Sequence, residues 1–426
     1  MLRFCMLTTF YPPYNFGGDG IGVQRLSRAL ARRGHRVTVV HDADAYGALA
    51  AGVPRETGPD EAGVEVVRLR SGVGTLSPLL TQQLGRPVVN GGRIRRLLAA
   101  GRYDVVMFHN KSLVGGPGLL SYGEGIKLYE AHEHWLVCPT HVLWRHGREP
   151  CDARECLRCV WSYRRPPQLW RYTGLLERQL THVDGFIAKS EFSRRKHAEF
   201  GFPREMQVIP YFLPDDVPGE AAGGAAGNGA GAAHQNGGRP YFLFVGRLER
   251  IKGLDDVIPA MAAYPQADLL IAGDGEYGGH LRELGRDLPN VRFLGRLAPE
   301  ALQALYADAV ALVVPSVCYE TFGIILIEAF RQGTPVLARR IGPFPEIVGA
   351  GGGLLFDAGD ELPGLMQRLQ GEAGLRSRLA ADARTAFQSH WTEAAVVPRY
   401  LELVAECAMR RGRGDIVERL TERSVA

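Results

Sequence analysis

The chain of 426 residues lacks several features that would assign it to a special class of protein. No apolar run approaches the ~20 residues that a membrane-spanning helix needs. The apolar N-terminus, residues 1–10, has no small-residue cleavage site and therefore indicates a buried strand rather than a signal peptide. The net charge of +4 does not indicate a nucleic-acid partner, although it suits an anionic ligand or a lipid surface. We expect a cytoplasmic protein that at most touches the inner face of a membrane peripherally.

A dinucleotide-binding fingerprint is also missing. Neither half contains a Gly-x-Gly-x-x-Gly that opens a helix after a strand, followed by an acidic residue about 20 positions later. This argues against a dinucleotide-dependent oxidoreductase. A hydrophobic content of 46% with 23% charged residues is typical of globular proteins, and the length suffices for two domains.

Strand-like and helix-like segments alternate along both halves, which is typical of parallel sheets with crossover helices. In the first half we predict a helix at 21–33 and strands at 3–8, 36–41 and 104–109. In the second half we predict strands at 241–245, 268–272, 291–294, 309–315 and 336–339. Two Rossmann-like α/β domains facing a cleft follow from this pattern.

A low-complexity segment separates the halves. Residues 214–239 are rich in Gly, Ala and Asn, and we interpret them as a flexible linker or insertion. The predicted domains are then 1–213 and 240–385, with a charged helical tail at 386–426.

Two carboxylates, Glu320 and Glu328, have seven residues between them at a predicted strand-to-helix junction. Glu320 follows the strand's carboxyl end, where open α/β sheets bind ligands. The amides of residues 321–323 open the helix and suit phosphate. Glu328 lies among apolar helix residues and needs a partner such as a ribose diol. The alternative is one solvated acid at each end of the helix.

Two cations and several glycine turns suggest an anion site. Arg247 and Lys252 follow the strand at 241–245 and could bind phosphate oxygens; the alternative is a pair of solvated surface cations. Residues 17–20 (Gly-Gly-Asp-Gly) and 273–275 (Gly-Asp-Gly) are glycine-rich turns after strands. Glycine permits close approach of an anion, but a plain tight turn explains residues 17–20 equally well, and residues 273–275 are expected mainly to shape their turn, with Gly275 giving close approach.

The Glu-x7-Glu spacing and the segment Gly246-Arg247-x4-Lys252-Gly253 resemble the retaining glycosyltransferases of family 4, a GT-B fold group. The turn at 273–275 and the segment 293–296 occur in the family's order, so the resemblance covers most of the second half. It implies a GT-B fold whose terminal helix crosses back to the first domain, near Trp391. It also implies a UDP- or GDP-hexose donor.

The resemblance assigns roles by position in this sequence. Glu328 would bind the donor ribose, and Glu320 would orient the transferred sugar. Arg247 and Lys252 would stabilise the leaving diphosphate, so the chemistry would need no metal or cofactor. The remaining donor-binding residues would be Gly17, Gly18, Gly275, Thr321, Phe322 and Gly323.

The segment from His132 to Trp135 is similar to the family's His-Asp-x-Trp segment, with Glu133 replacing Asp. The resemblance places His132 near the sugar's anomeric region, where positioning or hydrogen bonding to the hexose is a safer role than general base. It also implies front-face displacement without a covalent nucleophile. The Asp-x-Asp at Asp42 and Asp44 is in the wrong place for the family, and we interpret it as a solvated turn rather than a metal site.

Four of the seven cysteines, Cys138, Cys151, Cys156 and Cys159, have the spacing C-x12-C-x4-C-x2-C. This pattern indicates a structural zinc site that pins an irregular insertion. The alternatives are an iron–sulfur centre or four unrelated thiols, whereas disulfides disagree with a cytoplasmic location.

Two surface segments mix aromatic or apolar residues with arginine: residues 161–172, and the patch of Arg93, Arg95, Arg96 and Arg102 beside Ile94, Leu97 and Leu98. The first could stack on a sugar or sit at a membrane interface, and the second could dock to anionic lipid, although a solvated helix face is the simpler explanation of the second. The function we expect is retaining hexosyl transfer to a glycan, lipid-linked or small-molecule acceptor, as in cell-envelope polysaccharide biosynthesis. The alternative is a catalytically inactive nucleotide-sugar-binding or scaffold protein.

Overall fold

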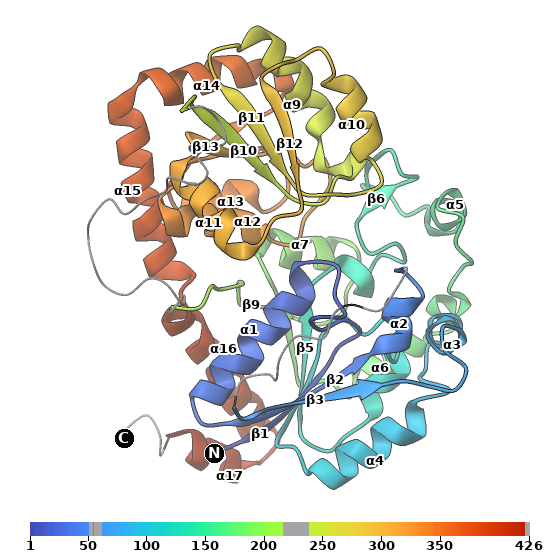
Figure 1. Ribbon diagram of the computed structural model, residues 1–426. Coiled ribbons are helices and arrows are strands. Elements are labelled where there is room, and N and C mark those ends of the chain that lie inside the picture. The colour runs from blue at the N-terminus through green and yellow to red at the C-terminus, as the bar shows by residue number, and fades with distance from the viewer. Residues whose placement is uncertain (51–53, 55–61, 216–237, 422–426) are drawn as a thin grey trace. The chain divides into compact units, whose positions relative to one another are not determined.

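The computed structural model describes residues 1–50, 54, 62–215 and 238–421 (Figure 1). The chain divides into two compact units: Met1–Pro214 together with Glu393–Ala426, and Asp215–Thr392. Most of the predicted linker at 214–239 lies outside the described residues. No helix within the described ranges has the length and apolar character required to cross a bilayer.

The first unit contains a seven-stranded parallel sheet with the strand order β3-β2-β1-β4-β5-β8-β9. Its strands are β1 (Arg3–Leu7), β2 (Arg36–Asp42), β3 (Val64–Leu69), β4 (Val105–Phe108), β5 (Ile126–Ala131), β8 (Gly185–Ala188) and β9 (Gln207–Val208). A short antiparallel pair, β6 (Trp144–Arg145) and β7 (Glu149–Pro150), lies apart from this sheet.

The helices of the first unit connect these strands. They are α1 (Gly18–Arg32), α2 (Ala43–Gly47), α3 (Leu76–Leu84), α4 (Gly91–Gly101), α5 (Cys156–Ser162), α6 (Leu175–Leu180) and α7 (Glu191–Glu199). Three short 3-10 turns, η1 (Pro117–Ser121), η2 (His134–Leu136) and η3 (Leu169–Tyr172), complete them. Alternate residues of β1 enter different cores: Phe4 and Met6 join one cluster, and Cys5 and Leu7 join another. Period-two alternation therefore gives the sheet a buried surface on both faces.

The chain returns to the first unit through α16 (Glu393–Arg410) and α17 (Gly414–Thr421). Buried residues recur on α16 at helical spacing, and they enter the same core as Phe4 and Met6: Val396, Val397, Tyr400, Leu403, Val404 and Cys407. Glu393 at the start of α16 forms ion pairs with Arg32 and Arg33 of α1. The predicted crossing back of the terminal helix is confirmed, and it begins two positions after Trp391 (Figure 1).

The second unit contains a six-stranded parallel sheet with the order β12-β11-β10-β13-β14-β15. Its strands are β10 (Tyr241–Val245), β11 (Asp268–Ala272), β12 (Val291–Gly295), β13 (Ala311–Val314), β14 (Val336–Arg339) and β15 (Gly353–Phe356). Its helices are α9 (Leu254–Ala260), α10 (Gly278–Leu284), α11 (Pro299–Asp308), α12 (Ile324–Gln332), α13 (Phe344–Gly349), α14 (Leu362–Gly371) and α15 (Ala373–His390), with short 3-10 turns η4 (Arg250–Lys252), η5 (Met261–Ala263) and η6 (Gly359–Glu361). Because β11 and β13 flank β10, the strand order reverses direction at β10, which makes its carboxyl end a ligand-binding position.

Two local predictions are wrong. The expected turn at 17–20 is largely helix, because α1 begins at Gly18 with Gly17 as its N-cap. Asp42 and Asp44 do not form a solvated turn: Asp42 is 1% exposed and caps α2 by accepting hydrogen bonds from the amides of Asp44 and Ala45. Asp44 accepts from the amide and hydroxyl of Ser71 at 2.8 and 2.7 Å. Burial raises the pKa of Asp42 to about 7.

Candidate functional site

The loops after β10 and β13 are joined at the carboxyl end of the second sheet. The amide of Val317 donates to the carbonyl of Ile251 at 2.9 Å. Gly253 has a φ of 74°, and a Cβ at this position would collide with the carbonyl oxygen of Pro315. Only glycine fits here without strain, so Gly253 lets the two loops approach each other.

This junction brings Lys252 and Glu320 together. Lys252 Nζ lies 2.5 Å from Glu320 Oε1, and the hydroxyl of Ser316 donates to the same oxygen at 3.2 Å. Burial would raise the pKa of Glu320, but the charge and hydrogen bond of Lys252, the Ser316 hydroxyl and the charge of Arg247 together lower it. Burial would lower the pKa of Lys252, but the charge and hydrogen bond of Glu320, together with Cys318 and Glu249, raise it. Both groups are therefore charged at neutral pH.

Arg247 adds a second positive charge on the same loop. Its side chain is 57% exposed and pairs with Glu249 at 3.0 Å, and its charge helps to lower the pKa of Glu320. The loop after β10 packs against the turn after β11, where a Cβ on Gly275 would collide with the carbonyl of Leu248. In this structure Gly275 therefore closes the packing of two loops against each other.

Helix α12 carries the second predicted carboxylate. Gly323 is the N-cap of this helix with a φ of 115°, and a Cβ there would lie 2.9 Å from the ring of Phe344. Phe322 is buried and Thr321 is partly exposed. Glu328 is partly exposed and accepts a hydrogen bond from the Tyr306 hydroxyl at 3.3 Å. The second unit thus places Arg247, Lys252, Glu320 and residues 321–323 on loops at one end of its sheet.

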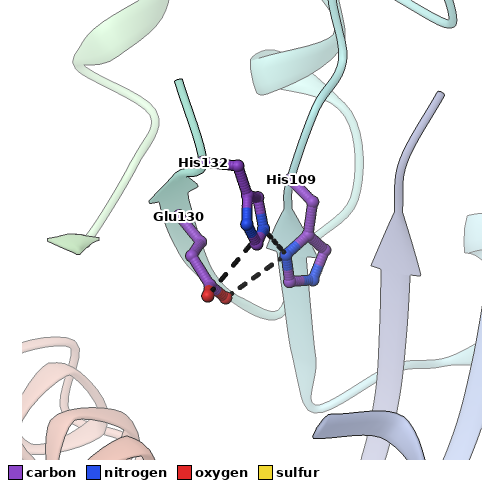
Figure 2. A group of neighbouring side chains, drawn as sticks. All are labelled: His109, Glu130 and His132. Carbon is purple, nitrogen blue, oxygen red and sulfur yellow. Dashed lines mark hydrogen bonds and ion pairs between the residues drawn. The ribbon is translucent and has the colours of Figure 1, made fainter. Parts of the chain in front are cut away.

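In the first unit, His132 belongs to a buried cluster with His109 and Glu130 (Figure 2). Phe108 pairs with Tyr129 across β4 and β5, so the next residues, His109 and Glu130, lie side by side. His109 Nδ1 is 3.0 Å from His132 Nε2 and 3.3 Å from Glu130 Oε2. Glu130 and His132 are two positions apart, as residues on one face of a strand are.

Glu130 is the charged centre of this cluster. Its Oε1 atom forms an ion pair with Lys189 and accepts a hydrogen bond from the Tyr400 hydroxyl at 2.9 Å. Lys189 also donates to the Tyr400 oxygen at 2.7 Å. Burial would raise the pKa of Glu130, but Lys189, His132 and His109 together hold it well below its usual value. The carboxylate and the ammonium therefore neutralise each other inside the unit.

His132 itself is enclosed by protein. Its side chain is 1% exposed, its Nε2 contacts His109, and its Nδ1 is hydrogen-bonded to the Tyr211 hydroxyl. Burial lowers the pKa of His132 to about 3, so the imidazole is neutral. A Cβ on Gly22 of α1 would meet the Tyr211 ring, so this glycine leaves room for the partner of His132.

The cluster is a buried network of hydrogen bonds and ion pairs. Within the described chain, His109, Glu130 and His132 are the residues whose metal-type ligand atoms all lie within 4.8 Å of one another. The Lys189 ammonium already neutralises Glu130, however, and would repel a divalent cation beside it. The charges therefore favour a network of hydrogen bonds over a metal site.

The predicted glycine loop lies at the N-terminus of α1. Gly17 and Gly18 are exposed, and Gly17 has no side-chain cap. Asp19 accepts a hydrogen bond from Asn110 at 3.0 Å, while burial raises the pKa of Asp19. Amides at the start of this 15-residue helix are oriented to bind an anion.

Two family models match the chain. The model of "Glycosyl transferases group 1" matches residues 232–385, and that of "Glycosyltransferase Family 4" matches residues 16–216. Together they cover both units. The chain belongs to the group 1 glycosyltransferases.

Relatives and solved structures agree with this assignment. The enzyme is 28% identical to a glycogen synthase from Mycobacterium tuberculosis, a match that covers 82% of this chain and 80% of the relative. It is 35% identical to a GDP-mannose-dependent mannosyltransferase acting on a phosphatidylinositol monomannoside in Corynebacterium glutamicum, over 34% of this chain and 42% of that one.

The fold matches solved GT-B glycosyltransferases. A sucrose-phosphate synthase from Thermosynechococcus elongatus superposes with a TM-score of 0.73 at 21% identity, covering 95% of this chain and 99% of that one. HepE from Anabaena, solved with UDP-glucose, superposes with a TM-score of 0.64 at 19% identity, covering 99% and 100%. These likenesses confirm the GT-B fold.

Sequence reasoning missed several residues around the glycosyltransferase's His132. Glu130 and Lys189 stand in or directly after apolar strands, and buried charges of opposite sign usually pair. The pattern of a charged residue in or directly after an apolar strand could therefore have identified Glu130 and Lys189. Tyr400 gives no such signal, because it reaches Glu130 from 270 positions away.

Proposed function

We propose that this glycosyltransferase moves a hexose from a UDP- or GDP-sugar to an acceptor hydroxyl with retention of anomeric configuration. The observation that carries the proposal is the charged pair of Lys252 and Glu320 beside Arg247, at the point where the second sheet reverses its strand order. Opposite charges held on loops at such a position suit a diphosphate linked to a sugar.

In the proposed reaction the bond between the sugar's anomeric carbon and the diphosphate oxygen breaks. Arg247 and Lys252 stabilise the charge that develops on the departing diphosphate. The acceptor oxygen bonds to the same face of the anomeric carbon, and its proton passes to the departing phosphate oxygen. Glu320 fixes Lys252 and orients the sugar, and no metal or cofactor takes part in the chemistry.

The other predicted donor contacts keep their roles in this proposal. Glu328 holds the ribose, and the amides of residues 321–323 approach the sugar and the pyrophosphate. Gly17 and Gly18 present the amides of α1 to the donor phosphates, which the exposure of both glycines supports. His132 stays a positioning residue, because its neutral ring has a partner on both nitrogens.

The test combines binding and turnover. Thermal unfolding is measured with UDP, GDP and ADP and with their hexose conjugates, without added metal, because a ligand of the folded state raises the midpoint. We expect one nucleotide to stabilise the wild type selectively and Lys252→Met to lose that shift. The control Arg340→Gln removes an exposed cation that pairs with Asp357, and should keep the shift. Selective binding with no donor hydrolysis or transfer to any acceptor would instead support the inactive scaffold.

We also propose that the acceptor is a glycan, a lipid-linked sugar or a small metabolite, with cell-envelope polysaccharide synthesis as the setting.

Peripheral contact with an anionic membrane at the cytoplasmic face is part of this proposal. Helix α3 packs on η3, and the two expose Leu76, Leu79, Leu84, Leu169 and Tyr172. Arg93, Arg95 and Arg96 are exposed on α4, whose Ile94 and Leu98 are buried in the core. Sedimentation with phosphatidylglycerol vesicles, with phosphatidylcholine vesicles as the control, tests this contact.

A further inference from the structure

The insertion between η2 and α5 holds an unusual amount of strained backbone. Three of its residues other than glycine have positive φ angles: His141 (76°), Leu143 (46°) and His146 (53°). Such conformations cost free energy and persist only where the surroundings fix them. The regular structure in this segment is the two-residue pair of β6 and β7, which is too short to fix the loop by itself.

Four cysteines surround this strained loop. Cys138 follows η2, and Cys151 follows β7 and donates its amide to the carbonyl of Leu143 at 2.8 Å. Cys156 and Cys159 lie three positions apart at the start of α5, so their thiols project from one side of the helix. All four are free thiols: Cys138 and Cys159 are buried, and Cys151 and Cys156 are half-buried.

The four thiols are close enough to act on one another. Burial, together with the smaller effect of the charges of Cys138, Cys156 and Cys159, raises the pKa of Cys151 to about 11. Burial and then the charges of Cys138 and Cys159 raise the pKa of Cys156, and burial and then the charge of Cys138 raise that of Cys159. The amide of His146 donates to Cys159 Sγ at 3.3 Å, a contact that favours a thiolate. Cys159 Sγ also lies 3.9 Å from the carbonyl oxygen of Trp144, so α5 packs against β6 and brings its two cysteines to the loop that carries Cys151.

Arginines surround these sulfurs. Arg145 favours the charged form of Cys151 and Cys159, and Arg154 and Arg171 favour that of Cys156. The Arg171 guanidinium is held by the carbonyl of Trp135 at 2.8 Å and the side chain of Gln168 at 2.7 Å. A centre of four thiolates and one divalent cation has a net charge of −2, which these cations would offset.

We propose that Cys138, Cys151, Cys156 and Cys159 bind one structural Zn²⁺ through four thiolates. Binding forms four Zn–S bonds and releases the four thiol protons to solvent, with no change of oxidation state. The sulfurs are less tightly gathered than the ligand atoms of the His109 cluster, so binding draws them together to Zn–S distances of about 2.3 Å. The metal then supplies the constraint that the left-handed residues of the loop need.

Metal content of the purified full chain tests the proposal. The protein is prepared without chelators or a metal-affinity tag and measured by inductively coupled plasma mass spectrometry, and we expect about one zinc per chain. Cys156→Ser should lose the zinc, whereas Cys407→Ala, which removes a buried thiol of the same unit outside the insertion, should retain it. Should Cys156→Ser fail to fold, cobalt replacement in the wild type still decides, because a tetrahedral thiolate site gives intense visible absorption.

Two results would overturn the zinc site. A metal-free chain whose four insertion thiols react freely with a disulfide reagent in the folded state would show that they bind nothing. Stoichiometric iron, together with the visible sulfur-to-iron absorption of an iron–sulfur cluster, would show that the cysteines hold such a cluster and not zinc. Neither readout depends on transferase activity, so failure here leaves the proposed function standing.

Discussion

Tyr400 donates a hydrogen bond to Glu130 Oε1 at 2.9 Å, although 270 positions separate the two residues. Its oxygen also accepts from Lys189. The helix that returns to the first unit thus places one hydroxyl in contact with both charges of a buried ion pair, and that pair supports His109 and His132.

Replacing Tyr400 with Phe should destabilise the protein by about 1–3 kcal/mol, because it removes one hydrogen bond from each of two buried charged groups. Denaturant unfolding of the wild type, of Tyr400→Phe and of a control variant measures the loss in the free energy of unfolding. Tyr264→Phe is the matched control: its hydroxyl bonds Gln370 in a partly buried position of the second unit, so the loss should be smaller. Equal losses would show that the buried pair does not depend on Tyr400.

Glu320→Gln should reduce transfer by roughly 10²–10³-fold while the fold is kept, because a neutral amide cannot hold the Lys252 ammonium as the carboxylate does. Initial rates with saturating donor, together with circular dichroism, measure this. Glu361→Gln serves as the control, since that carboxylate accepts from the amides of Asp357 and Ala358 on an exposed turn. Wild-type rates in Glu320→Gln would remove this residue from the site.

Stability should depend on pH through Asp42. Its folded pKa of about 7 lies above the ordinary value of 3.8, so the buried carboxylate costs stability above pH 7, and the cost disappears as pH falls toward 3.8. Asn also caps helices well. Asp42→Asn should therefore be more stable than the wild type at pH 8 and nearly equal to it at pH 4, as thermal unfolding in the two buffers can check. A constant difference across this range would contradict the assigned pKa.

Gly253→Ala should destabilise the second unit by more than 1 kcal/mol, because it strains a φ of 74° and collides with Pro315. It should also weaken donor binding by shifting Lys252. Gly364→Ala is the control: this glycine lies inside α14 with nothing within 4 Å of an added Cβ, and alanine there should be stabilising by about 0.5–1 kcal/mol. Differential scanning calorimetry shows whether each substitution lowers or raises the unfolding midpoint.

Much of the second unit could be predicted because most of its strands are largely apolar runs bounded by turns. The bounds of β10, β11 and β14 match the predicted ranges. The start of α1 was misplaced because glycine is a poor helix former, yet it is tolerated in a first turn whose amides lack helical partners. Helix propensity alone does not distinguish a glycine in the first turn of a helix from a glycine in a loop.

The cluster around His132 was harder to predict. Glu130 meets Lys189 because β5 lies beside β8, and it meets Tyr400 because α16 returns to the first unit. Neither adjacency is encoded in spacing along the chain. Lys252 and Glu320 were found because each follows a strand, but their contact depends on β10 and β13 being neighbours.

The return of α16 has a consequence for how the protein is made. A ribosome releases residues 1–214 long before it reaches Val396, Val397 and Leu403, which complete the hydrophobic core of the first unit. The second unit, synthesised in between, is continuous and can finish folding first. The second unit then folds before the first, which reverses the usual N-terminal-first order. The N-terminal half keeps an exposed apolar surface until the last helix has been synthesised.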